Sequence, residues 1–258
     1  MIKQLFFLSV LDIATTQAQT LVVKPFLQDA EPQSIRITWE TSSDTESKAY
    51  WGTVANALND STIGTAMTGQ GSSQIHHVQL TGLQPETRYF YRVKTGSLSS
   101  SIEQLVTPPL KNAEKGFKLV AMSDMQQDSG NPTVFSEICN GGIIPYITSH
   151  YSNDLPKELA FVMIPGDLVD NGLIYSQWAN TFFTPSENVF KNVPVYPVLG
   201  NHEVNTPTYF KYFSLPENGT SGFLEHWWYK DYSNLRIIGL NSNTGYTTQT
   251  QLDWLQSV

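Results

Sequence analysis

Three short polar motifs, each directly after an apolar run, constrain the fold of this chain more than any other feature. They are Ser-Asp-Met-Gln at 123–126, Gly-Asp-Leu-Val-Asp-Asn-Gly at 166–172 and Gly-Asn-His-Glu at 200–203. The runs before them, at 117–122, 159–165 and 193–199, have the length and apolar composition of buried strands. Open α/β sheets build their binding sites at the carboxyl ends of such strands. The motifs therefore predict an α/β sheet with a polar site along one edge.

The side chains in these motifs suit a metal-assisted hydrolase. Asp124 and Asp167 offer carboxylate oxygens, Asn201 offers an amide oxygen, and His202 is a potential proton donor beside them. Hard metal ions prefer oxygen donors of this kind, and metal ions assist hydrolysis of phosphate esters. Taken alone, an Asp that ends a strand is as readily explained as a turn or helix cap. It is the succession of three motifs that favours a metal site.

The order and spacing of the motifs resemble those of calcineurin-like metallophosphoesterases over residues 117–258. The resemblance implies an α/β domain of four layers, α/β/β/α, and a centre of two divalent or trivalent ions, which are iron, zinc or manganese. It implies that Asp124 binds the first ion, Asp167 bridges both ions and Asn201 binds the second. It also implies that metal-bound hydroxide attacks phosphorus. His202, with Asn201, would then contact the phosphate, and His202 would protonate the leaving group.

Two positions depart from the family pattern. The family usually has His or Gly two residues after the first Asp, whereas this chain has Gln126, whose amide oxygen would bind a hard metal weakly or hold a ligand water. Purple acid phosphatases have an iron-binding Tyr where this chain has Asp170, which argues against a purple iron–tyrosinate centre. We expect Asp170 to stabilise the loop after Asp167, and Glu203 to support the turn at His202.

The resemblance also implies further His ligands downstream, from a lone His and a Gly-His-x-His motif. After His202 the sequence contains only His226, and it stops soon after the segment Gln251-Leu-Asp-Trp-Leu. In the family a helix with this Trp-Leu pair precedes those ligands. We therefore expect the α/β domain to be incomplete at the C-terminus, and the 258-residue chain to be poorly stable and nearly inactive.

Residues 20–107 are predicted to form an all-β sandwich. The segments 34–40, 77–80 and 89–93 alternate apolar and polar residues, as half-buried strands do. Trp39 is a candidate core residue. The motif from Leu83 to Tyr89 resembles the tyrosine corner of fibronectin type III-like domains, in which the Tyr hydroxyl bonds back to the turn. This layout resembles the N-terminal domain of purple acid phosphatases, and residues 108–116 are predicted to be a linker.

Local signals predict further elements in the α/β domain. Asn131 and Pro132 predict a helix start, with the helix running to about residue 149, and Cys139 packed within it. A second helix is expected at 174–180, interrupted by Pro185, followed by a buried strand at 235–240 and a helix after 247. The pair Trp227 and Trp228 is open to two interpretations: a rim that stacks a base, or core packing.

Charge and the N-terminus limit the functional classes. The chain has 15 Lys+Arg against 23 Asp+Glu, a net charge of −8, and no basic cluster, which argues against a nucleic acid polymer as partner. Residues 1–19 combine a charged start, a short apolar run and a final stretch of small residues. This pattern predicts a signal peptide and export to the periplasm, cell surface or medium. The apolar run is too short to span a membrane.

The sequence therefore predicts an exported metal-dependent hydrolase of small phosphate esters, a phosphomonoesterase similar to acid phosphatases. Two alternatives remain open. One is a phosphodiesterase or nucleotidase of the same fold. The other is a cell-surface binding protein whose phosphoesterase domain is degenerate. A zinc or manganese requirement for hydrolysis would favour the enzyme, and binding that is insensitive to chelators would favour the last alternative. The oligomeric state and the physiological substrate are left open.

Overall fold

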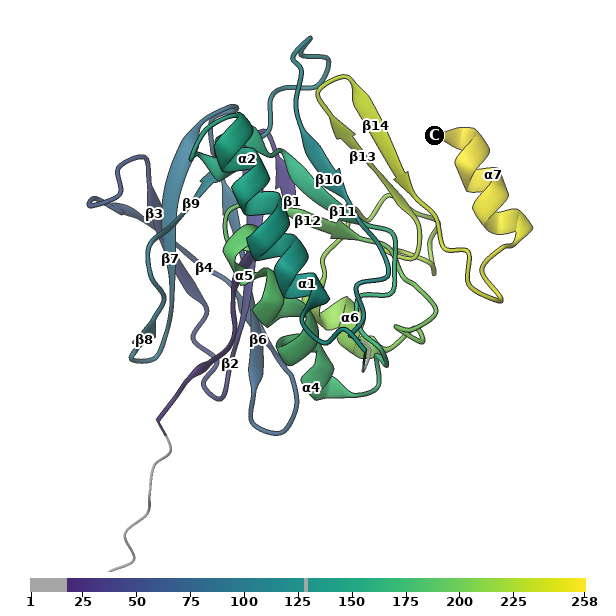
Figure 1. Ribbon diagram of the computed structural model, residues 1–258, viewed down its shortest axis with the longest axis horizontal. Coiled ribbons are helices and arrows are strands. Elements are labelled where there is room, and N and C mark those ends of the chain that lie inside the picture. Colours follow the sequence, from purple (N-terminus) through teal and green to yellow (C-terminus); the bar gives the residue numbers. More distant parts are fainter. Residues whose placement is uncertain (1–17, 128–129) are drawn as a thin grey trace, which may run out of the picture.

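The computed structural model describes residues 18–127 and 130–258 (Figure 1). The predicted signal peptide, 1–19, falls almost entirely outside these residues. In the part of the chain that the structure describes, no helix has the length and apolarity needed to cross a membrane.

The N-terminal part consists of two antiparallel sheets. One has the order β1-β2-β6-β5 and the other the order β4-β3-β7-β8, with β9 also paired to β7. The strands are β1 (Leu21–Glu31), β2 (Ser34–Thr41), β3 (Lys48–Gly52), β4 (Asp60–Ile63), β5 (Thr65–Thr68), β6 (Gln74–Thr81), β7 (Arg88–Thr95), β8 (Leu98–Ser99) and β9 (Glu103–Val106). The three strands expected from alternation correspond to β2, β6 and β7.

Alternation along β2 creates the core of this sandwich. Ile35, Ile37 and Trp39 are fully buried on one face of the strand, because side chains two residues apart point the same way. The expected tyrosine-corner bond is also present, since the Gln84 backbone N–H donates to the Tyr89 hydroxyl at 2.8 Å. The local turn prediction is therefore confirmed.

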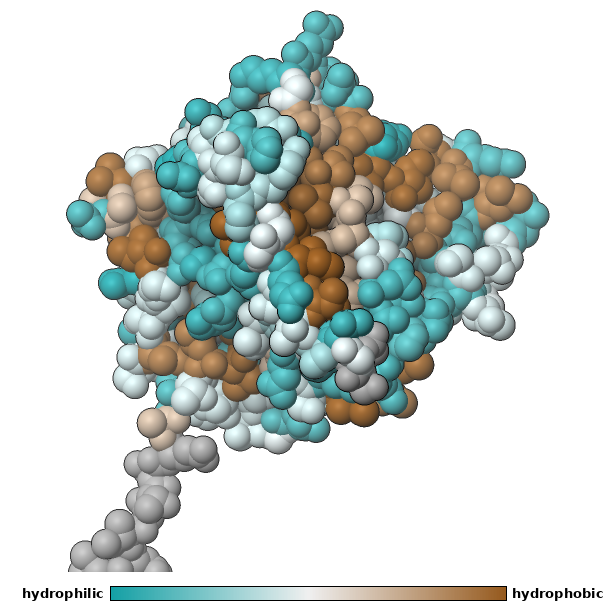
Figure 2. All heavy atoms as spheres, in the orientation of Figure 1, coloured by the Kyte–Doolittle hydropathy of each residue, from teal (hydrophilic) through white to brown (hydrophobic). Residues whose placement is uncertain are grey.

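A three-stranded parallel sheet follows. Its order is β10 (Leu119–Ala121), β11 (Phe161–Ile164) and β12 (Val195–Pro197), which places β11 in the middle. All three expected strands are present, but the expectation that the first is buried is wrong, because β10 is an edge strand and Leu119 is 37 % exposed. An apolar groove of about 560 Å³ runs beside β10, where Figure 2 shows hydrophobic side chains gathered.

The helices of this part contain π-helical segments. One helix joins α1 (Val134–Ser136), the π-helical η1 (Glu137–Ile143) and α2 (Ile144–His150), and a second joins α4 (Tyr175–Gln177), η2 (Trp178–Phe183) and α5 (Thr184–Phe190). Thr133, not Asn131, is the N-cap of the first helix. Pro185 does not interrupt the second, which continues through this residue from η2 to the end of α5 at Phe190. The short helix α3 (Leu155–Glu158) precedes β11.

The C-terminal elements lie at the end of the molecule opposite the sandwich (Figure 1). They are the hairpin β13 (Trp228–Tyr232) and β14 (Leu235–Gly239) and the helix α7 (Gln249–Ser257), while α6 (Pro207–Tyr212) comes earlier in the chain. The expectation of a buried strand at 235–240 is wrong in part, since Ile238 is 38 % exposed. Ile237 is buried, so this strand has one covered face.

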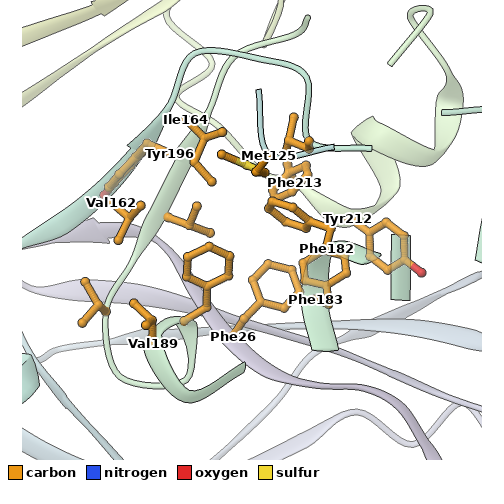
Figure 3. Packing of buried hydrophobic residues seen from close by; sticks show 14 of the residues in the cluster. Phe26, Met125, Val162, Ile164, Phe182, Phe183, Val189, Tyr196, Tyr212 and Phe213 are labelled. Carbon is orange, nitrogen blue, oxygen red and sulfur yellow. The ribbon is translucent and has the colours of Figure 1, made fainter. Parts of the chain in front are cut away.

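Besides the core of the sandwich itself, a second hydrophobic core is shared by the sandwich and the α/β part. Phe26 of β1 packs against Phe183 of η2, with ring centroids 4.6 Å apart, and Phe182 and Phe213 continue the cluster (Figure 3). Cys139 is fully buried, as expected, and burial raises the pKa of its thiol to about 12. The shared core fixes the sandwich against the helices that follow the polar motifs.

Candidate functional site

The three polar motifs meet at one edge of the parallel sheet. Asp124 follows β10, Asp167 follows β11 and Asn201 follows β12. Because the strands are parallel and neighbouring, their carboxyl ends lie at the same edge. Asp167 therefore follows the middle strand, with the other two motifs on either side.

The backbone at this edge adopts uncommon conformations, and the loops of the second and third motifs lie very close together. Asp124 and Asp167 have φ angles of 57° and 55°, a left-handed region in which residues other than glycine are uncommon. Such residues cost about 1–3 kcal/mol each and cluster at functional sites. A Cβ atom on Gly200 would lie 2.1 Å from Asp167 Oδ1, so only glycine lets the two loops approach this closely.

Glu203 ties the second and third motifs together. Its side chain is fully buried and accepts hydrogen bonds from the backbone N–H groups of Asp167 (3.0 Å), Leu168 (2.7 Å), Val169 (3.4 Å) and Gly200 (2.7 Å). Burial raises the pKa of this carboxyl, and the amide hydrogen bonds oppose that rise. The expected support of the local turn is confirmed, and the same carboxylate also holds the loop that carries Asp167.

His202 is held by hydrogen bonds on both its backbone and its ring. Its backbone N–H donates to Asp167 Oδ1 at 3.1 Å, and its carbonyl accepts from Gly172 at 2.8 Å. The ring Nδ1–H donates to the carbonyl oxygen of Asp170 at 2.6 Å, and this bond raises the pKa of the imidazole. Nε2 is thereby the ring nitrogen left to meet a ligand. The expected role of Asp170 in stabilising the loop is performed by its backbone carbonyl.

The other predicted site residues share the edge without direct contact. The structure brings Asp167 and His202 into contact, whereas no hydrogen bond among the described residues joins Asp124 to Asp167 or Asn201. Asp124 and Asn201 are exposed, and the Asp124 carboxylate accepts a hydrogen bond from the neighbouring Ser123 hydroxyl. Gln126 Oε1 is buried and has no hydrogen-bond partner within the described part of the chain.

The donor set is compatible with a hard metal ion. Within residues 18–127 and 130–258, no group of three or more His, Cys, Asp or Glu side chains is arranged to hold one. The predicted set instead combines two carboxylates with the amide oxygens of Asn201 and Gln126. A buried acceptor without a partner costs about 1–3 kcal/mol, and a bound cation would remove that cost for Gln126. Carboxylate and amide oxygens are ligands that hard cations accept.

Asn243 is a supporting residue that the sequence analysis missed. Its side-chain amide donates to the carbonyl oxygens of Leu199 (3.1 Å) and Gly200 (3.2 Å), which flank the third motif. Its backbone N–H donates to Asn241 Oδ1 at 3.0 Å. In the sequence, two Asn residues lie in a loop between a predicted strand and a predicted helix. This composition indicates a turn, but it does not reveal which backbone groups the Asn side chains contact.

The interpretation of Trp227 and Trp228 as a base-stacking rim is wrong. Both side chains are fully buried, Trp227 against Phe223 and Trp228 against Tyr196, and core packing is therefore correct. His226 is half-buried and stacks on Tyr246 with ring centroids 4.7 Å apart. Tyr246 accepts a hydrogen bond from Asn205 at 2.8 Å, so this aromatic pair borders the segment after the third motif.

Comparison with known proteins finds similarity along both parts of the chain. The family described as "Purple acid Phosphatase, N-terminal domain" matches residues 23–107, and "Calcineurin-like phosphoesterase" matches residues 117–257. Purple acid phosphatase 13 of Arabidopsis thaliana is 27 % identical over 216 residues, which cover 72 % of this chain and 39 % of that protein. The chain thus spans less than half the length of the curated relatives it matches.

Two solved structures have a similar fold. The structure of purple acid phosphatase PPD1 from yellow lupin seeds has a TM-score of 0.66 at 17 % identity, covering 90 % of this chain and 47 % of that one. The structure of PhoD has a TM-score of 0.57 at 13 % identity, covering 86 % of this chain and 52 % of that one. At these identities the similarity concerns the fold alone.

Proposed function

The chain belongs to the calcineurin-like phosphoesterase family, and we propose that it is a metal-dependent hydrolase of small phosphomonoesters with a dinuclear metal centre. The expected order of an antiparallel β domain followed by an α/β phosphoesterase domain is confirmed. The observation that carries the proposal is the arrangement of the motifs: Asp124, Asp167 and Asn201 follow three neighbouring parallel strands, and His202 contacts Asp167.

The order of the strands supports the roles that we assign to the ligands. Asp124 and Gln126 follow an outer strand and would hold one cation, while Asn201 follows the other outer strand and would hold the second. Asp167 follows the middle strand and is our candidate for the bridging ligand. Two cations in such a centre neutralise the charge of a phosphate ester and lower the pKa of water. The metals we propose are iron, zinc or manganese.

His202 is our candidate for contact with the phosphate and for proton donation. Its Nδ1–H is engaged by the Asp170 carbonyl, which orients the ring and raises its pKa, so Nε2–H of the protonated ring would be the donor to a bound phosphate. Transfer of that proton to the leaving oxygen would assist cleavage of the ester bond. The hydrogen bond from the His202 backbone N–H to Asp167 Oδ1 leaves the second carboxylate oxygen, Oδ2, for a cation.

The proposed substrate is a small monoester. The net charge of −8 disfavours a nucleic acid polymer, and burial of Trp227 and Trp228 removes the aromatic surface that the nucleotidase alternative relied on. We also propose export, based on the composition of residues 1–19. Fractionation of cells that express the chain with and without these residues tests export: retention of both forms in the cytoplasm would contradict it.

Metal binding and hydrolysis test the proposed function together. We expect the chelator-treated chain to bind Mn²⁺ or Zn²⁺ in calorimetry, and Asp167→Asn to weaken binding at least tenfold, since about 1.4 kcal/mol of lost charge interaction suffices. Asp170→Asn is the matched control, because Asp170 contributes its carbonyl rather than its carboxylate to the site.

Hydrolysis supplies the second readout. We expect p-nitrophenyl phosphate to be cleaved faster than bis(p-nitrophenyl) phosphate, only with added metal, and slowly, since the predicted donor set contains no His ligand. Metal binding that is unchanged in Asp167→Asn would contradict the proposed centre. Binding of other molecules that chelators do not affect, without any metal binding, would instead favour the degenerate binding protein.

A further inference from the structure

A buried carboxylate of the sandwich contacts both helices that follow the candidate site loops. Glu40 lies in β2 and is fully buried. Its Oε1 accepts from the Tyr175 hydroxyl at 2.8 Å and its Oε2 accepts from the Tyr212 hydroxyl at 2.6 Å. Tyr175 begins α4, directly after the loop of Asp167, and Tyr212 ends α6, which follows the loop of His202. One side chain thus connects two elements that are distant in sequence.

The surroundings of Glu40 are polar and closely packed. A Cβ atom on Gly69 would lie 2.3 Å from the Tyr175 hydroxyl and 2.7 Å from Glu40 Oε1, so the backbone of the sandwich passes close to this pair. Burial raises the pKa of both tyrosines, which keeps their hydroxyls protonated as donors. Tyr212 also packs against Phe183, with ring centroids 4.8 Å apart, at the margin of the shared core (Figure 3).

The sandwich holds the end of α6 through further contacts. Gln28 Nε2 donates to the Tyr212 carbonyl at 2.9 Å, and Gln28 Oε1 accepts from the Ser214 backbone N–H at 2.8 Å. At the start of α6, the Thr206 backbone N–H donates to the Glu203 carbonyl at 2.9 Å. α6 is therefore fixed by the sandwich at one end and attached to the third motif at the other.

We propose that Glu40 is a positioning residue, through which the sandwich fixes the loops carrying Asp167 and His202 relative to each other by way of Tyr175 and Tyr212. This inference rests on the proposed function of those loops. Glu40 thereby gives the N-terminal part a role in organising the site. Each of its two carboxylate oxygens accepts a hydrogen bond from one tyrosine, so a single side chain holds two separate helices. Removing either hydroxyl releases one of the two elements, and removing the carboxylate releases both.

Hydrogen exchange and metal affinity together test this role. We expect Glu40→Ala to speed amide exchange in both 167–174 and 200–206, and Tyr212→Phe to speed it in 200–206, each about tenfold, the change expected from one lost buried hydrogen bond. Both variants should weaken Mn²⁺ binding by a similar factor. Glu40→Asp, which keeps both acceptor oxygens, should restore part of the wild-type behaviour.

Tyr91→Phe is the matched control. It removes another buried hydroxyl at the contact between sandwich and helices, but this hydroxyl donates to the Lys191 carbonyl at 2.7 Å, at the end of α5. We expect it to leave exchange in both loops unchanged. Equal effects of Tyr91→Phe and Tyr212→Phe on the loops, or wild-type exchange in Glu40→Ala, would overturn the proposal. If the wild-type chain binds no Mn²⁺, the proposed function fails, and the exchange comparison still decides whether Glu40 positions the loops.

Discussion

Replacing Glu203 with Gln removes one acceptor oxygen from the connection between two site loops. Glu203 Oε2 accepts from Asp167 (3.0 Å) and Gly200 (2.7 Å), and Oε1 accepts from Leu168 (2.7 Å) and Val169 (3.4 Å). A Gln side chain has nearly the same shape but only one acceptor oxygen. Its NH₂ group would face one of these two pairs of backbone N–H donors.

The expected loss in the free energy of unfolding follows from the less destabilising of the two orientations of the Gln amide. With NH₂ toward Leu168 and Val169, one short and one long hydrogen bond are lost. Each buried donor left unsatisfied costs about 1–3 kcal/mol, and the long bond is at the low end of that range. Burial, which raises the pKa of Glu203, favours a neutral side chain and offsets part of this cost. We expect a net loss of about 2–4 kcal/mol in the free energy of unfolding.

Urea unfolding followed by tryptophan fluorescence measures this loss, with the slope of the transition checked against the wild type. Glu225→Gln is the matched control: burial also raises the pKa of Glu225, but within residues 18–127 and 130–258 this carboxylate accepts one backbone N–H, that of Leu215, at 2.8 Å. We expect the control to lose about 1 kcal/mol or less. If Glu203→Gln is as stable as the wild type, the backbone hydrogen bonds do not hold the loops and the reasoning is refuted.

Three further outcomes are expected. Gly200→Ala should lower the melting temperature strongly, because its Cβ would lie 2.1 Å from Asp167 Oδ1, and an unchanged melting temperature would contradict this packing. Burial lowers the pKa of His77 from 6.5 to about 4, so the unfolded state binds the proton first. Protonation of His77 should therefore lower stability by up to about 3 kcal/mol as pH decreases from 6.5 to 4, and this part of the fall should be absent in His77→Gln, in which His76, whose pKa burial also lowers to about 4, still contributes. Tyr89→Phe leaves the Gln84 N–H without its acceptor and should lower the free energy of unfolding by about 1–3 kcal/mol, measured as a lower urea midpoint at constant slope.

Local patterns in the sequence predicted the strands and the place of the site. Alternation identified β2 and the buried Trp39, and the polar motifs after apolar runs located Asp167 and His202 at one sheet edge. The same patterns were wrong about the burial of Leu119, because an apolar run does not reveal whether its strand is central or at an edge. They also placed the first helix start at Asn131, two residues before the N-cap in the structure.

What the sequence determined by itself is the class of fold and the donor types of the site, since periodicity and turn chemistry act between near neighbours. Only the tertiary structure decided how these residues are held. The carboxylate of Glu203 accepts hydrogen bonds from backbone amides of the loop after β11, and Glu40 accepts hydrogen bonds from Tyr175 and Tyr212. Such hydrogen bonds connect residues far apart in the chain. Which residues pair in these hydrogen bonds depends on how whole helices and strands pack. No periodic pattern in the sequence around any one of these residues indicates its partner.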